Sequence, residues 1–135
     1  RKFKRVRPVL IKGRKYRDSL KEIWNSDIFF DEIWIEGTWG QGGIEAMAMG
    51  KPVLAYLADG TIRWWKDVLG CQELPIINVN PENLEERLIE LIEDRELRQE
   101  WGRKGREWFK RFWDSKEMVE RVIAFYEALP PLRRI

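Results

Sequence analysis

The stretch GQGGIEAMAMGKPV, residues 40–53, decides the fold of this chain, because it joins a glycine-rich loop to a short helix and then to a strand. Its glycines allow a tight turn and bring backbone amides close to a ligand. The helix beside them directs unpaired N–H groups and a partial positive charge outward, which suits a phosphate. Glu45 falls near the start of this helix, where its carboxylate can accept hydrogen bonds from vicinal hydroxyls such as those of a ribose. The stretch therefore predicts a corner that binds a phosphate and a sugar.

Outward from this stretch, short apolar runs alternate with amphipathic segments. Strands are predicted at residues 6–11, 29–35, 53–57 and 76–79. Helices are predicted at residues 16–24, 43–49, 62–69, 81–93 and 94–113, and a last helix opens at Asp114. This order predicts an α/β fold, a Rossmann-like three-layer α/β/α sandwich with a mainly parallel sheet of about four strands.

Local signals place the ends of several elements. Gly50 and Pro52 are expected to stop the helix at residues 43–49. A turn is predicted at residues 59–60. Asn80 stands before a proline, so it is expected to cap a helix whose first residue is Pro81.

Composition narrows the class of protein. A chain of 135 residues with 44% hydrophobic residues is expected to form a single domain, residues 1–135, and no apolar run approaches the ~20 residues of a membrane span. Cys71 is the only cysteine and histidine is absent, which excludes an internal disulfide, a histidine triad and Cys/His metal sites within the chain. A cytoplasmic, reducing location is expected.

The string GQGGIEAMAMGKPVLAY resembles the donor-binding motif of retaining glycosyltransferases of the GT-B fold, in particular the family-four or group-one class. The flanks LIELIEDRELRQEWGRKGREW and DSKEMVERVIAFYEAL are similar to the closing helices of that class. The resemblance implies the later part of a C-terminal, donor-binding domain. The acceptor-binding domain and the first βαβ unit of the donor domain are then missing, and the sequence does not decide between a fragment and a small stand-alone relative.

The resemblance also implies a function, the transfer of a sugar from a nucleoside-diphosphate sugar to an acceptor. It requires no metal and no cofactor beyond that donor substrate. Glu45 is implied as the acceptor for the ribose hydroxyls. The remaining donor-binding residues are implied to be Gly40, Gln41, Gly42 and Gly43 at the phosphates, and Lys12, Gly13 and Arg14 near the base. The base, the sugar and the acceptor are not specified.

One departure from the family pattern concerns the sugar side of the site. The family carries two glutamates with seven residues between them, whereas Glu36 and Glu45 have eight between them, so the expected first position falls on Gly37. Either the loop bulges so that Glu36 keeps the catalytic role of positioning the donor sugar, or that role passes to Thr38 or to backbone amides.

The strands at residues 6–11 and 29–35 are not neighbours in the family, because two further strands separate them. Either they pair directly here, or another chain fills the gap, since unpaired strand edges invite such pairing. A homodimer, or a complex with the missing acceptor-binding domain, is therefore expected.

Three other interpretations remain open. Residues 1–21 hold ten Lys or Arg and one acid, a cluster that could bind nucleic acid or the anionic surface of a membrane, although no nucleic-acid motif accompanies it and a solvated edge is commoner. The aromatic face of residues 101–112 resembles an interfacial membrane helix, but packing on the sheet explains it without any lipid, is commoner, and is the default interpretation. A GT-B nucleotide-sugar epimerase shares a similar glycine–glutamate corner.

Overall fold

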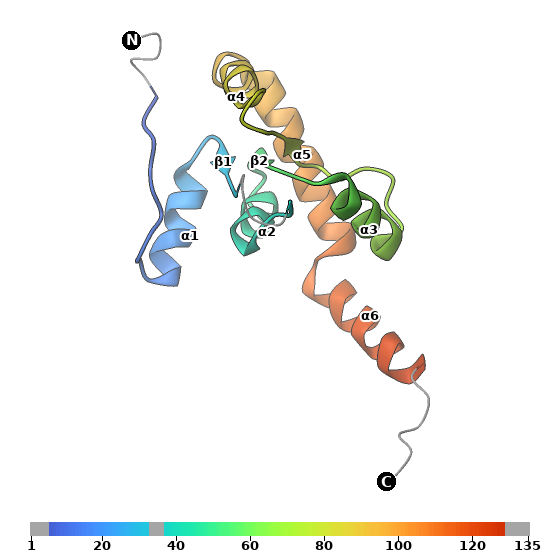
Figure 1. The fold of residues 1–135 in the computed structure, drawn as a ribbon. Helices are drawn as coiled ribbons and strands as arrows, with labels where there is room; N and C mark the ends of the chain where they lie inside the picture. The colour runs from blue at the N-terminus through green and yellow to red at the C-terminus, as the bar shows by residue number, and fades with distance from the viewer. Residues whose placement is uncertain (1–5, 33–36, 129–135) are drawn as a thin grey trace.

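The computed structural model describes residues 6–32 and 37–128. Its helices are α1 (Tyr16–Asn25), α2 (Gln41–Ala48), α3 (Asp59–Leu69), α4 (Leu84–Glu93), α5 (Arg95–Phe112) and α6 (Ser115–Ala128). Its strands are β1 (Phe29–Phe30), β2 (Val53–Ala55) and β3 (Ile77–Asn78). The fold class predicted from the sequence is confirmed: helices flank a small parallel sheet in a mixed α/β, Rossmann-like arrangement (Figure 1).

The sheet has the order β1-β2-β3, and both pairings are parallel. Phe29 lies opposite Val53, and Leu54 lies opposite Ile77. Backbone bonding continues past the end of β1, because the amide of Asp31 donates to the Leu54 carbonyl at 2.9 Å. β2 is buried at every position, which explains why the central strand is an uninterrupted apolar run.

The predicted fourth strand, at residues 6–11, is wrong. This segment pairs with no strand in the part of the chain that the structure describes, and the sheet has three strands there instead of about four. Residues 6–10 are exposed, with Val6 46% and Leu10 79% exposed, while Ile11 is half-buried against the core. A strand exists only when its backbone groups find partners. Pro8 removes one donor, and the apolar pattern alone could not supply the missing neighbour.

Helices cover both faces of the sheet. Successive residues of a strand point to opposite faces. Val53 accordingly packs in one cluster with Met47 of α2 and Trp108 of α5. Leu54 packs in a second cluster with Leu91 of α4. These two apolar layers account for the three-layer arrangement.

α2 and α5 cross at very short distance. A Cβ atom built on Gly102 would lie 2.1 Å from the carbonyl oxygen of Gly50. One turn further along α5, a Cβ on Gly105 would lie 3.2 Å from Cγ of Met47. Both α5 glycines are buried. Only residues without a side chain let the two backbones approach this closely, so this crossing fixes α2 on the sheet.

The carboxyl end of α2 is bonded to its surroundings. Gly50 adopts a left-handed φ of 71° and its amide donates to the Met47 carbonyl at 2.9 Å, which is the helix stop expected at this position. The Arg106 guanidinium of α5 donates to the Ala48 carbonyl. A cation at a helix carboxyl end also complements the helix dipole.

Three helix starts differ from the predictions. α2 begins at Gln41 instead of residue 43. α3 begins at Asp59, so the predicted turn at residues 59–60 is instead the first turn of that helix, where an acid is favourable. α4 begins at Leu84 instead of Pro81. The Asn80 carboxamide oxygen accepts two backbone amides and closes a separate turn ahead of α4.

The aromatic face of α5 lies in the core. Trp108 and Phe112 are 6% and 7% exposed, and Trp101 and Phe109 are half-buried. The core interpretation of residues 101–112 is therefore confirmed in preference to a membrane-surface helix.

α6 differs from the other helices in that none of its residues is buried. Figure 1 shows it leaving the end of α5 and pointing away from the sheet. Its start is capped by Asp114, whose carboxylate accepts the Lys116 amide at 3.2 Å. Val119, Ile123 and Phe125 are each at least half exposed.

Substitution of Gly102 by alanine tests the crossing of α2 and α5. The new Cβ would meet the Gly50 carbonyl, so the helices must separate, and we expect the free energy of unfolding to fall by about 1–3 kcal/mol. Gly60→Ala is the matched control, because its Cβ would meet nothing within 4 Å inside α3 and should leave stability unchanged or raise it by up to about 1 kcal/mol. Urea denaturation measures both. Equal free energies for the two variants would contradict the close crossing.

Candidate functional site

The glycine loop reaches α2 through Trp39, whose side chain anchors the loop in the core. Trp39 is 7% exposed. Its ring centroid lies 4.9 Å from that of Trp65 and 6.1 Å, edge to face, from that of Trp108. Aromatic pairs at these separations are favourable. The amino end of α2, which follows at Gly40, is thereby held in one place.

The amino end of α2 is occupied by a carboxylate of the chain itself. Oδ2 of Asp31, just past β1, accepts the amide of Gly40 at 2.9 Å and the amide of Gly43 at 3.1 Å. A negative charge here satisfies unpaired N–H groups and complements the helix dipole. Within the described residues, the amides of Gln41 and Gly42 donate to no protein acceptor.

The glycines at 42 and 43 have a packing reason as well as the binding role predicted for them. A Cβ on Gly43 would lie 2.6 Å from Oδ2 of Asp31. A Cβ on Gly42 would lie 2.9 Å from Cζ of Phe29. Any larger residue at either position would push the helix away from the end of β1.

Glu45 is tied to α1. The hydroxyl of Tyr16 donates to Oε1 of Glu45 at 2.6 Å, and this hydrogen bond raises the pKa of the Tyr16 hydroxyl. The donor and acceptor lie at a solvent-accessible surface, with Tyr16 66% exposed. A carboxylate has about four lone-pair positions, so Glu45 can still accept hydrogen bonds from a ligand.

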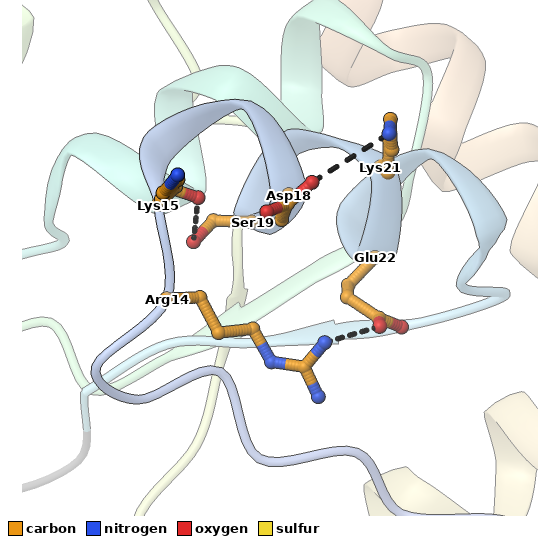
Figure 2. Close-up of polar contacts among 6 residues, drawn as sticks. All are labelled: Arg14, Lys15, Asp18, Ser19, Lys21 and Glu22. Atoms are coloured by element: carbon orange, nitrogen blue, oxygen red, sulfur yellow. Dashed lines mark hydrogen bonds and ion pairs between the residues drawn. The ribbon is translucent and has the colours of Figure 1, made fainter.

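The predicted base-binding residues lie in the loop before α1. Lys12 and Gly13 are exposed, and Gly13 has no neighbour that a side chain would touch. Arg14 is not free, because its Nη1 donates to Oε1 of Glu22 at 2.6 Å (Figure 2). The loop runs directly into Tyr16, whose bond to Glu45 joins the start of α1 to α2.

The basic character of this region is partly neutralised on α1 itself. Figure 2 shows Lys21 paired with Asp18 across one turn, at 3.5 Å, alongside the pair formed by Arg14. The Ser19 hydroxyl in the same view donates to the Lys15 carbonyl at 3.4 Å. Exposed pairs of this kind contribute little stability, so their main effect is on local charge.

The sugar side of the site falls partly outside the described residues. Glu36 is among residues 33–36, which the structure does not describe. Gly37 is buried with φ of 61°, and a Cβ there would lie 2.5 Å from Cβ of Ala58. A glutamate cannot occupy position 37 without displacing that contact. Thr38 is half-buried next to it.

Within residues 6–32 and 37–128, every helix is too short or too polar to span a membrane. In the same ranges, no group of three or more His, Cys, Asp or Glu side chains is arranged to hold a metal ion.

Comparison with known proteins identifies the family. A family model described as glycosyl transferases group 1 matches residues 9–108. The chain belongs to this family. It is 36% identical over 118 residues to an uncharacterized glycosyltransferase of Methanocaldococcus jannaschii, a match covering 87% of this chain and 32% of that protein. The chain thus spans about a third of the length of this relative, and no solved structure gives a significant match.

Three residues that shape the site were not predicted from the sequence. Asp31 falls inside the strand predicted at residues 29–35, and because it lies nine residues before Gly40, no local signal marks it as the cap of α2. The sequence predicts Tyr16 only as the start of a helix and predicts no role for Trp39. Tyr16 contacts Glu45, 29 residues further along the chain, and Trp39 contacts Trp108, 69 residues further along. No local sequence pattern predicts contacts over such separations.

Asp31→Ala tests the internal cap. Loss of an oxygen that accepts two amides at a helix start should lower the free energy of unfolding by about 1–2 kcal/mol. Asp27→Ala removes an exposed acid from the turn before β1 and should change it by less than about 0.5 kcal/mol. Chemical denaturation of both variants gives the comparison. A loss at Asp27 as large as that at Asp31 would argue against the cap.

Titration of the tyrosines tests the bond between Tyr16 and Glu45. The pKa of Tyr16 is raised above the usual value of about 10 because the neutral hydroxyl donates to a carboxylate. The stabilisation is therefore complete below pH about 10 and is lost as the pH rises through the raised pKa. We expect tyrosinate absorbance to show the Tyr16 transition at a lower pH in Glu45→Gln than in the native chain. An unchanged titration would mean that this hydrogen bond is not formed in solution.

Proposed function

We propose that this chain is the nucleotide-sugar-binding portion of a glycosyltransferase of the GT-B type, which transfers a sugar from a nucleoside-diphosphate donor to an acceptor. The observation that carries the proposal is the juxtaposition of Glu45, the open amides at the start of α2 and the loop before α1. Membership of the group 1 glycosyl transferases supports glycosyl transfer as the reaction class.

In this proposal the start of α2 binds the diphosphate. The amides of Gln41 and Gly42 donate to phosphate oxygens, while Asp31 keeps those of Gly40 and Gly43 and so holds the loop in shape. The helix dipole would stabilise the charge that grows on the diphosphate as the sugar departs. This chemistry is electrostatic and requires neither a metal nor a nucleophile from this chain.

Glu45 binds the ribose in this proposal. Tyr16 donates to Oε1 of Glu45 and so fixes the direction of the carboxylate. The remaining lone pairs of the carboxylate would accept hydrogen bonds from the two ribose hydroxyls. Lys12, Gly13 and Arg14 lie before Tyr16 and would contact the base. Gly37, at the position where the family carries a glutamate, packs on Ala58, so the sugar side would be taken either by Glu36 or by Thr38 or backbone amides.

The acceptor would be bound outside the present chain. The chain covers 32% of its archaeal relative, which leaves ample length for an acceptor-binding domain. The outer edge of β1 has no strand beside it within the described residues, and the homodimer predicted from the sequence would be one way to cover it. Contact with a membrane surface or with nucleic acid through residues 1–21 is less favoured, because Arg14 and Lys21 are already paired. The family match is to transferases, which also disfavours an epimerase.

Calorimetric titration of the chain with UDP, GDP and ADP tests the proposal. We expect one nucleoside diphosphate to bind, and Glu45→Gln to weaken that binding about tenfold or more, because a carboxylate that accepts two hydroxyl bonds loses its charge. Glu86→Gln is the matched control, since Glu86 is an exposed glutamate on α4 and should leave binding unchanged.

The same titration contains the outcome that would defeat the proposal. If none of the three nucleotides gives a heat of binding, or if Glu45→Gln binds as tightly as the native chain, then Glu45 and the start of α2 do not form the donor site. Tyr16→Phe separates the orienting role from the binding role, because it should weaken binding less than Glu45→Gln does.

A further inference from the structure

The outer edge of β1 carries backbone groups that face away from the sheet. The Phe29 amide donates to the Pro52 carbonyl, just before β2, at 3.0 Å. The Asp31 amide donates to the Leu54 carbonyl of β2 at 2.9 Å. Backbone groups of successive strand residues point to opposite sides, so those of Phe30 face away from β2. In the part of the chain that the structure describes, no strand lies on that side, and the Phe30 side chain is 42% exposed there.

An exposed segment with the pattern of a strand precedes α1. Residues 6–10 are exposed and belong to no sheet, and Val9 is 43% exposed. The chain that follows is tied to its own core and to α1, because Ile11 packs half-buried against the core and Arg14 bonds Glu22. Figure 1 shows the segment on the far side of α1 from β1. The segment therefore does not cover the open edge of β1 in its own chain.

The segment and the edge carry opposite charges around apolar centres. Residues 27–32, which include β1, read DIFFDE and hold three acids and no base. Residues 7–12 read RPVLIK and hold two bases and no acid. The charged residues at the ends of both stretches are exposed: Arg7, Lys12, Asp27 and Glu32. None of these four takes part in an ion pair among the described residues. Such charges are free to pair across two neighbouring strands.

One antiparallel register matches the backbone, the apolar residues and the charges together. With Val9 opposite Phe30, these two residues exchange both backbone hydrogen bonds, and Ile11 falls opposite Ile28. The position of Pro8 then faces away from β1, so its missing N–H costs no hydrogen bond. The charged ends meet as two pairs, Arg7 with Glu32 and Lys12 with Asp27. A parallel register would instead set Ile11 against a carboxylate, which favours the antiparallel direction.

We propose that residues 7–12 of one copy of this chain add as an antiparallel strand to the outer edge of β1 in a second copy. A two-fold arrangement, in which each copy gives and receives this strand, covers both edges and closes the assembly. The strand pattern that finds no neighbour within its own chain then finds one in the partner. The proposal does not rest on nucleotide binding, because the two copies associate without a ligand.

Sedimentation velocity across a dilution series of the chain tests the association. We expect a reversible dimer that salt weakens, because exposed charge pairs are screened. Arg7→Glu should weaken dimerisation about tenfold, because it sets like charges opposite each other twice in the dimer. Glu32→Arg should do the same, and the two changes combined should restore the native affinity. Arg63→Glu is the matched control, since Arg63 is an exposed cation on α3 and should leave the dimer unchanged. A native chain that stays monomeric throughout the series, or a combined variant that dimerises no better than Arg7→Glu, would refute the proposal.

Engineered cysteines test the register. Residues that exchange both bonds in an antiparallel pair have Cα atoms about 5.5 Å apart, which suits a disulfide. On mild oxidation, a mixture of Val9→Cys and Phe30→Cys chains should form more cross-linked dimer than either variant alone, as seen on a non-reducing gel. A mixture of Leu10→Cys and Phe30→Cys should form less, because Leu10 would face the other side of the added strand. Cross-linking through Leu10 that equals or exceeds that through Val9 would overturn the register. Val9, Leu10 and Phe30 are all exposed, so these changes should leave the fold intact.

Discussion

The close crossing of α2 and α5 is the constraint on which the candidate site depends. α2 has eight residues, too few to be stable as a helix by itself. Gly102 allows the two backbones to touch at Gly50, and Arg106 bonds the last turn of α2. Asp31 holds the other end. Since α2 carries Glu45 and follows directly from the glycine loop, the geometry offered to a ligand is set by contacts at both ends of this short helix.

The start of α2 already carries an acceptor that the chain itself supplies. Asp31 accepts two of its amides, so the loop is held in place without a ligand, and a phosphate bound there would have to tolerate the nearby charge of Asp31. Preorganisation of this kind reduces the entropy lost on binding but also lowers the electrostatic attraction.

The sequence predicts those parts of the structure that local chemistry determines. The periodicity of α1 and α5 placed both helices within about a residue of their observed ends, and Gly50 ends its helix as expected. The strand at residues 6–11 failed because pairing depends on a neighbour that an apolar pattern does not reveal. The EAMA string predicts the position of the candidate site. The bond of Tyr16 to Glu45 joins residues 29 apart and emerges only when α1 packs on α2.

α6 has no buried residue, and its backbone is therefore held by little more than its own hydrogen bonds and the junction with α5. An isolated helix of 14 residues is marginal in water. Its amides should accordingly exchange with solvent deuterium far sooner than those of α5, whose inner face is locked under Trp108 and Phe112. If amide hydrogen exchange slowed strongly in α6 alone, this would show that another surface had bound against Val119, Ile123 and Phe125.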